Sequence, residues 1–331
     1  MPDQDAKTFV GIDIGGTKSA VVLMTEDGRL VSREQFATEK GKDRWRNTAD
    51  TMIRLIRRMT EKRSVEAIGV SCGGPLDSRR GRILSPPNLQ GWDDVPIVEL
   101  FENEFGLPAF LENDANAGAL AEWKFGAGKG TRNMVFLTFG TGLGAGLILD
   151  GRLYAGTNDL GGEAGHIRLE KDGPIGYHKR GSFEGFCSGK GLAQMMTAEL
   201  LCLAEEEGRE PVLERYKEPS RVTGQDVVEW AKAGDGRALA VVRKSGTYLG
   251  KGLAVLIDIL NPQVVVVGGM GVRLGDLLFE PARAVIREEA IPAANAVCRI
   301  VPAALGESTG DFAALCVALE GLKRGGAIKS T

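Results

Sequence analysis

The chain has 331 residues, 43% of them hydrophobic and 26% charged, which is enough for about two globular domains and excludes a disordered chain. A formal charge of -3 provides no broad cationic surface for a phosphate backbone, so nucleic acid is not an expected partner. The polar N-terminus and the absence of a long uninterrupted apolar stretch predict neither a signal peptide nor a membrane span.

The numbers and spacing of the cysteines and histidines limit the disulfides and metal sites that can be expected. The five cysteines are scattered without a C-x-x-C pair, so they predict no disulfide framework and favour a cytoplasmic protein. The chain has only two histidines, His166 and His178, which excludes a multi-histidine metal cage. Its 46 glycines suggest places where the backbone approaches a ligand.

The N-terminal segment predicts three strands joined by tight turns. Residues 8–24 are β-branched and apolar on both sides of Gly15-Gly16-Thr17-Lys18, and Asp27-Gly28 separates them from residues 30–38. Residues 45–62 then have apolar side chains at helical spacing, and residues 65–70 form a short apolar strand. A further strand at residues 107–111 ends at Glu112-Asn113-Asp114, where an Asn or Asp could cap a helix that begins at Ala115.

The same pattern recurs later in the chain. A strand at residues 134–139, a glycine turn at residues 140–144 and a strand at residues 145–149 lead to Asp150-Gly151-Arg152-Leu153, which repeats Asp27-Gly28-Arg29-Leu30. We interpret this recurrence as two structurally related halves. A charged, turn-rich stretch follows near residues 205–224, then helices at residues 226–233 and 237–259, a strand at residues 263–267 and a closing helix at residues 311–322.

The two glycine turns predict a nucleotide site. Asp13, Gly15, Gly16, Thr17 and Lys18 combine a carboxylate, flexible backbone, a hydroxyl and an ammonium group, which together suit Mg²⁺ and phosphate oxygens. Alone, this segment could be a plain hairpin turn. An equivalent turn with Gly140, Thr141 and Gly142 in the other half favours phosphate binding between the halves.

Neither glycine turn has G-x-G-x-x-G spacing, and residues 185–190 are one residue short of a P-loop, so Rossmann and P-loop sites are excluded. Gly268 and Gly269 follow a buried strand and could let adenosine approach the backbone, although helix capping explains them as well.

A second group of polar residues suits a polyol. A carboxylate such as Asp114 can accept the proton of a sugar hydroxyl that attacks phosphorus, although Asn113 and Asp114 could equally be helix caps. Glu163, His166 and Glu184 add groups that bond adjacent hydroxyls, and for His166 alone a structural role is also open.

These motifs together resemble the ROK family (repressor, open reading frame, kinase) of sugar kinases, over nearly the whole chain. The resemblance implies an α/β fold with two actin-like ATPase (ribonuclease H-like) domains and a cleft between them. Domain ranges of 1–118 and 119–331 follow, with the last helix packing back on the first domain. It also implies ATP and Mg²⁺ in the cleft, a homodimer, and phosphoryl transfer to a hexose hydroxyl, with C6 as the expected position.

The resemblance also assigns roles to residues. Asp114 would be the base, and the sugar ligands would be Gly74, Asn88, Asn113, Asp114, Glu163, His166 and Glu184. Asp13 would hold Mg²⁺ through water, and the two glycine turns with Gly268 and Gly269 would bind the nucleotide. The motifs do not identify which hexose or N-acetylhexosamine is the substrate.

The sequence differs from the family pattern in two ways that bear on zinc binding and on catalysis. The family's usual zinc segment has three cysteines, and Ile175, Tyr177 and Ser182 stand at the corresponding positions, so we expect no zinc. Family repressors carry a helix-turn-helix before the first phosphate motif, whereas only twelve residues precede Asp13 in this sequence. We therefore expect a kinase rather than the alternative, a non-catalytic sugar-sensing ROK protein. An ATP-binding scaffold without a sugar site is disfavoured by Asn113, Glu163, His166 and Glu184.

Overall fold

The computed structural model describes the backbone of residues 6–328 and the side chains of residues 6–325. These residues divide into two compact units, each built around a sheet of five strands. The first unit comprises the described residues up to Gly130, Leu153–Gly161 and the residues from Glu307 onward, and the second comprises Thr131–Arg152 and Gly162–Gly306. The boundary after residue 118 falls inside a helix, α3 (Asp114–Lys124). Compactness alone does not define an independently folding domain, so the domain ranges stay a prediction.

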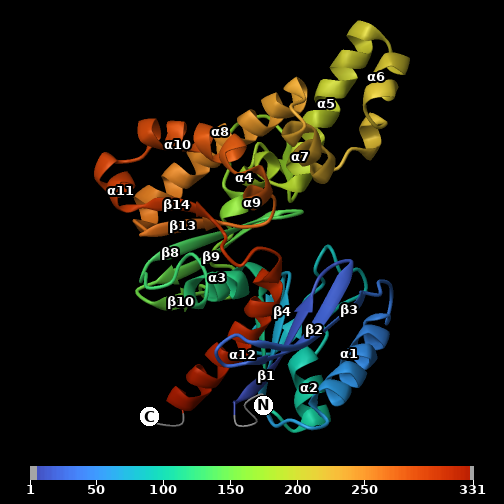
Figure 1. Ribbon diagram of the computed structural model, residues 1–331, viewed down its shortest axis with the longest axis vertical. Helices are drawn as coiled ribbons and strands as arrows, with labels where there is room; N and C mark the ends of the chain where they lie inside the picture. The colour runs from blue at the N-terminus through green and yellow to red at the C-terminus, as the bar shows by residue number, and fades with distance from the viewer. Residues whose placement is uncertain (1–5, 329–331) are drawn as a thin grey trace. The chain divides into compact units, whose positions relative to one another are not determined.

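The first sheet has the strand order β3-β2-β1-β4-β7 (Figure 1). β2 runs antiparallel to both β1 and β3, whereas β4 runs parallel to both β1 and β7. The bounds confirm the predicted N-terminal strands and turns: β1 (Thr8–Ile14), β2 (Lys18–Thr25), β3 (Leu30–Ala37), β4 (Val65–Cys72) and β7 (Ala109–Asn113). A short hairpin, β5 (Leu76–Asp77) and β6 (Arg82–Ile83), lies between β4 and β7 in the chain.

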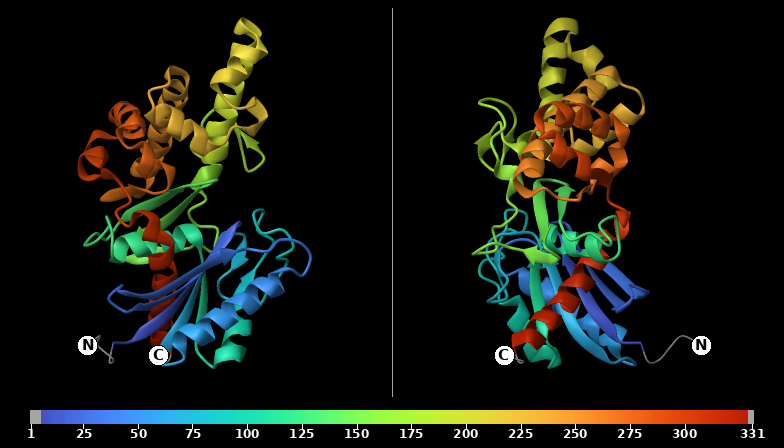
Figure 2. Two further views of the ribbon diagram at one scale, coloured as in Figure 1. Left: turned by 45° about the vertical axis from the view of Figure 1, so that its right-hand side comes forward. Right: turned by 90° about the vertical axis from the view of Figure 1, so that its left-hand side faces the viewer.

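Helices cover both faces of this sheet (Figure 2). One face packs against α1 (Trp45–Thr60) and α2 (Ile97–Phe105), where Ile12 and Ile14 of β1 join Met52 of α1 in one buried cluster. The other face packs against α12 (Thr309–Ile328), where Phe9 meets Leu315, and α3 packs against α12. Both faces of β1 are therefore apolar, because alternate side chains point to opposite faces of a strand.

Gly69 lets α12 lie directly on the sheet. A Cβ at Gly69 would lie 2.2 Å from the carbonyl oxygen of Ala314 and 2.5 Å from the amide nitrogen of Ala318. No side chain fits at such distances, so this position in β4 requires glycine. The described C-terminal helix is thus part of the core made by the first strands of the chain.

The second sheet repeats the topology of the first, with the order β10-β9-β8-β13-β14. Here β8 pairs antiparallel with β9 and parallel with β13, as β1 does with β2 and β4. The strands are β8 (Met134–Phe139), β9 (Leu143–Leu149), β10 (Arg152–Tyr154), β13 (Val264–Val267) and β14 (Arg299–Pro302). The repeated order confirms the prediction of two related halves.

The second unit is richer in helices than the first. They are α4 (Phe183–Phe186), α5 (Gly189–Glu207), α6 (Arg209–Arg215), α7 (Gly224–Lys232), α8 (Gly236–Leu260), α9 (Met270–Leu274), α10 (Asp276–Glu289) and α11 (Pro292–Val297). Asn261 ends α8 in the left-handed conformation, so the predicted end of this helix is confirmed. None of the helices in the described part of the chain has the length and apolarity needed to cross a membrane.

The predicted turn-rich stretch near residues 205–224 is wrong in part. It contains the end of α5, all of α6 and a short 3₁₀ helix, Pro219–Arg221. Its charges lie on exposed helix faces, where Arg215 pairs with Glu207, while Val212 is buried. The single buried residue in this short helix gave too weak a helical period to recognise in the sequence.

Candidate active site

The first glycine turn joins β1 to β2, and Asp13 is the residue before the last of β1. The Gly15 amide donates to the carbonyl oxygen of Lys18 (3.1 Å), which closes the turn. A Cβ at Gly16 would lie 2.9 Å from both Cβ and the carbonyl oxygen of Asn88, so the absence of a side chain lets the Asn88 segment approach. The structure thus brings Asn88 against the first glycine turn, while Thr17 and Lys18 remain exposed.

Asp13 lies in an acidic environment. Burial raises its pKa to about 6, the negative charges of Asp114 and Asp311 add to this effect, and Arg33 opposes it. Arg33 also donates through Nε to both carboxylate oxygens of Asp311, at 3.1 and 2.9 Å. Asp311 was not among the predicted site residues, because nothing in the sequence brings it near Asp13.

This surplus of negative charge suits a divalent cation, whose preferred ligands are carboxylate and water oxygens. Between residues 6 and 325, however, no three His, Cys, Asp or Glu side chains form a group that could hold a metal by themselves. Asp13 fits an ion that keeps most of its water ligands, as Mg²⁺ does.

The carboxyl ends of the parallel strands β1, β4 and β7 bring the predicted acceptor residues together. Cys72, the last residue of β4, pairs with Ile14 on one side and Asn113 on the other. Gly73 and Gly74 follow β4, and the Gly74-Pro75 peptide is cis. Ligands of α/β sheets bind at this edge, so the geometry agrees with a substrate site here.

Asn113 is the N-cap of α3. Its Oδ1 accepts from the amides of Ala115 (2.9 Å) and Asn116 (3.4 Å). This confirms the capping that the sequence left open, and it leaves the amide nitrogen, Nδ2, on the side of Gly74, 3.3 Å from where a Cβ would stand. Asn113 can therefore cap the helix and still offer a donor to a substrate, so the two interpretations are compatible.

Asp114 begins α3 beside this cap. Its Oδ1 accepts from the Ala115 amide (2.8 Å), and its Oδ2 is 3.8 Å from where a Cβ of Gly73 would stand. The residue is exposed to solvent, yet surrounding protein desolvates the carboxylate and raises its pKa. An accessible carboxylate with a raised pKa has the properties that a general base needs.

In the second unit, Glu184 is linked to the second glycine turn. Its Oε2 accepts from the Leu143 amide (3.0 Å), and a Cβ at Gly142 would lie 2.6 Å from the same oxygen. Ser182 caps the short helix that carries Glu184 by accepting from the Gly185 amide (3.1 Å). Glu184 therefore has a bond that the sequence did not predict, in addition to any bond that it makes with sugar.

Glu163 precedes a 3₁₀ turn, Ala164–His166, that packs on β9, and His166 is the last residue of this turn. The His166 amide donates to the carbonyl oxygen of Glu163 (3.1 Å), and a Cβ at Gly165 would lie 2.1 Å from the Leu143 carbonyl oxygen. The same Cβ would be 3.3 Å from Cβ of Glu184. The structure thus brings the segments of these three predicted sugar ligands together within the second unit.

A cavity of about 520 Å³ in the second unit is lined by three of the ten residues that were predicted to bind the nucleotide. Gly140, Thr141 and Gly269 line it, whereas Gly142 and Gly268 do not. Gly269 has a positive φ of 60°, and a Cβ there would lie 2.3 Å from the Phe139 carbonyl oxygen, so the position requires glycine.

Several residues that line this cavity were not among the predicted site residues. All but one lie at the N-termini of α5, α7 and α9, namely Gly189, Lys190, Thr223, Gly224, Gln225 and Met270. Arg273 lies in the last turn of α9. The amide of Gly189 donates to the Gly140 carbonyl oxygen (2.8 Å), which joins α5 to the glycine turn. The sequence feature that could have indicated this part of the cavity is Ser188 followed by Gly189-Lys190-Gly191. A serine often caps a helix N-terminus, and the two glycines leave room there for a ligand.

Hydrogen bonds hold the loop in which the zinc cysteines are replaced. Ile175 lies in a hairpin of β11 (Ile175–Gly176) and β12 (Lys179–Arg180), and Tyr177 and His178 form its turn with φ values of 39° and 64°. The Ser182 hydroxyl is 3.4 Å from the Gly176 carbonyl oxygen. Lys179 donates through Nζ to the carbonyl oxygen of His166 (2.8 Å).

We predict that the purified protein contains no stoichiometric zinc, because a structural zinc site needs about four ligands. Elemental analysis of protein prepared without chelator is the measurement, with added EDTA as the comparison. About one zinc per chain, removed together with activity, would contradict the prediction.

The chain is similar to glucokinases and to a xylose repressor. A glucokinase of Halalkalibacterium halodurans is 32% identical over 91% of this chain and 92% of its own. A ROK family glucokinase from Streptomyces griseus, solved with glucose and AMPPNP, has a TM-score of 0.78 and 30% identity over 95% of this chain and 99% of its own. A xylose repressor of Caldicellulosiruptor bescii is also similar, at 27% identity over 86% of this chain and 71% of its own.

The fold class predicted from the sequence is thus confirmed, as two sheet-based units of an actin-like ATPase type. The model of the ROK family matches residues 9–320, which extend from β1 into α12. The chain belongs to the ROK family.

Proposed function

We propose that the protein is an ATP-dependent hexose kinase that transfers the γ-phosphoryl group to a sugar hydroxyl, at C6. The observation that carries the proposal is Asp114, an accessible carboxylate of raised pKa at the carboxyl ends of the parallel strands. Similarity to the glucokinase solved with glucose and AMPPNP supports both substrates.

In the proposed reaction, Asp114 accepts the proton of the sugar hydroxyl as that oxygen forms its bond to the γ-phosphorus. The bond from phosphorus to the bridging oxygen breaks, and ADP leaves. Asn113 donates from Nδ2 to the sugar, and Gly74, Asn88, Glu163, His166 and Glu184 supply the remaining sugar contacts. These contacts orient the hydroxyl toward phosphorus, which removes much of the entropic part of the barrier.

The backbone amides of the two glycine turns bind phosphate oxygens in this proposal, and the 520 Å³ cavity takes adenosine. Mg²⁺, when bound, neutralises phosphate charge, and Asp13 holds it through water. The resemblance further implies a homodimer, which stays a prediction that light scattering can check.

A coupled ADP-release assay over a panel of hexoses and N-acetylhexosamines tests the proposal. Hexose-dependent ADP release above the rate without sugar is the expected result. The repressor relatives keep a second candidate open, a sugar sensor without catalysis. A sensor would bind sugar in calorimetry and release no ADP, and this result would replace the kinase proposal.

We predict an acid limb in the pH dependence of kcat/KM for the hexose. Asp114 works as a base only when ionised, and desolvation raises its pKa above the ordinary 3.8. Asp13, whose pKa is raised to about 6, must also be ionised to hold Mg²⁺ in the proposed reaction. Activity is therefore present above the raised pKa values of these two carboxyls and is lost as pH falls through them. Initial rates in constant-ionic-strength buffers measure the midpoint, and a midpoint at or below 3.8 would contradict desolvation of Asp114.

A further inference from the structure

Glu112 is a buried carboxylate that the proposed reaction does not use. It is the residue before the last in β7, pairs in register with Ser71 of β4 and is only 4% exposed. Placing a carboxylate in such an environment is costly unless hydrogen bonds or opposite charges compensate. Its partners therefore indicate what this residue does.

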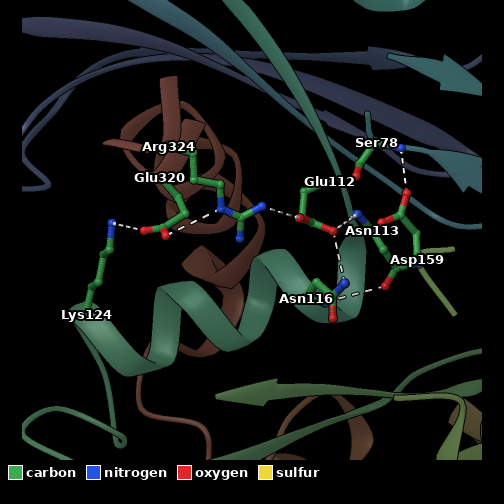
Figure 3. Close-up of polar contacts among 8 residues, drawn as sticks. All are labelled: Ser78, Glu112, Asn113, Asn116, Lys124, Asp159, Glu320 and Arg324. Carbon is green, nitrogen blue, oxygen red and sulfur yellow. Dashed lines mark hydrogen bonds and ion pairs between the residues drawn. The ribbon is translucent and has the colours of Figure 1, made fainter. Parts of the chain in front are cut away.

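One oxygen of Glu112 accepts two hydrogen bonds, from Asn113 and from Asn116 (Figure 3). Oε1 accepts from the backbone amide of Asn113 (3.0 Å) and from Nδ2 of Asn116 (2.9 Å). Asn113 directly precedes Asp114, and Asn116 is two residues beyond it. A single acceptor atom thus fixes the strand end and the first helical turn between which Asp114 lies.

The cap of α3 completes this arrangement. Asn113 accepts through Oδ1 from the amides of Ala115 and Asn116, and its own backbone amide donates to Oε1 of Glu112. The bonds hold Asn113 with its Nδ2 toward Gly74 and hold the backbone from which the Asp114 carboxylate projects. A displacement of such groups by about 1 Å can lower the reaction rate about 10²-fold.

The second oxygen of Glu112 makes a weaker contact. Oε2 lies 3.9 Å from an Arg324 nitrogen on α12, and the Arg324 side chain is 48% exposed. Arg324 also lies near Glu320 (3.7 Å), which in turn lies near Lys124 at the end of α3 (3.6 Å). Half-exposed ion pairs contribute little to stability, so Glu112 acts mainly through the hydrogen bonds of Oε1.

We propose that Glu112 is a positioning residue for phosphoryl transfer, acting through the hydrogen bonds of Oε1 to Asn113 and Asn116. It aligns Asn113 and Asp114 with the sugar hydroxyl and touches neither substrate. This inference rests on the proposed kinase function.

Two substitutions at Glu112 separate hydrogen bonding from charge. Glu112→Gln keeps a carbonyl acceptor in place of Oε1, removes the charge and puts an amide nitrogen in place of Oε2, so we expect kcat within about threefold of the unsubstituted protein. Glu112→Ala removes the acceptor, and we expect kcat to fall by about 10- to 100-fold. The KM for ATP should stay unchanged in both variants, because Oε1 of Glu112 bonds to Asn113 and Asn116, and neither of them belongs to the proposed nucleotide site. A loss of folded protein would also lower the apparent kcat without changing KM, so each rate is normalised to the folded fraction of that variant.

Asn116→Ala serves as a second test if Glu112→Ala does not fold, since it removes one of the two bonds and leaves the carboxylate. Glu320→Gln is the matched control, because it alters the same group of charges without touching Glu112, and its kcat should be unchanged. Circular dichroism verifies folding of each variant.

The outcomes distinguish the two proposals. If the unsubstituted protein releases no ADP with any hexose, the proposed function fails. If it is active and a folded Glu112→Ala or Asn116→Ala keeps kcat within about threefold, the positioning role is wrong. A Glu112→Gln variant as inactive as Glu112→Ala would also overturn the inference, because charge rather than the acceptor geometry would then be required.

Discussion

Asp114→Asn is expected to lower kcat for hexose phosphorylation by about 10²-fold or more while sugar binding persists. The amide can still accept from the Ala115 amide, as Oδ1 of Asp114 does at 2.8 Å, so the start of α3 should keep its shape. It cannot take the proton of the attacking hydroxyl. The ADP-coupled assay measures kcat, and titration calorimetry measures the dissociation constant of the sugar.

Asp50→Asn provides the control for this substitution. Asp50 lies on the exposed face of α1 in the same unit, so the same chemical change there should leave kcat unaltered. A folded Asp114→Asn protein with nearly unchanged kcat on a good substrate would remove Asp114 from the role of base.

Gly69→Ala is expected to destabilise the protein by about 3 kcal/mol, near the upper part of the range for overpacked cores. The added Cβ would lie 2.2 Å from the Ala314 carbonyl oxygen, and α12 can avoid it only by moving away from β4. Urea unfolding monitored by circular dichroism gives the change in the free energy of unfolding.

Gly325→Ala is the matched change within α12 itself. A Cβ there meets nothing within 4 Å, so alanine should be neutral or stabilise the helix by about 0.5–1 kcal/mol. Equal stability of the two variants would show that α12 does not rest on Gly69 as tightly as the distances indicate.

The sequence predicted those parts of the fold whose signal is local. The strands beside Gly15-Gly16 and the matching turn at Gly140 were recognisable because strand periodicity and turn chemistry involve neighbouring residues. The cap at Asn113 was predictable for the same reason. The helix at Arg209–Arg215 was missed because too few of its residues are buried to set a period.

The parts that could not be predicted depend on contacts between distant segments. Asp311 influences Asp13 only because α12 packs on β1, and the bond from Leu143 to Glu184 exists only once the second unit has folded. The cavity residues around Gly189 and Gly224 likewise come from separate helices. Residue type indicated the chemistry of the site, whereas the packing determined which groups share it.

The position of α12 constrains the order of events during synthesis. The face of the first sheet that carries Phe9, Val22 and Met24 is covered by Leu315 and Ala318. The ribosome must therefore translate residues 131–308 before this cover exists, which takes roughly 10 to 40 s at usual elongation rates. During that interval the nascent chain exposes an apolar sheet face, the kind of surface that chaperones bind. A chain stalled before residue 309 would keep that face open and become a target for aggregation or proteolysis.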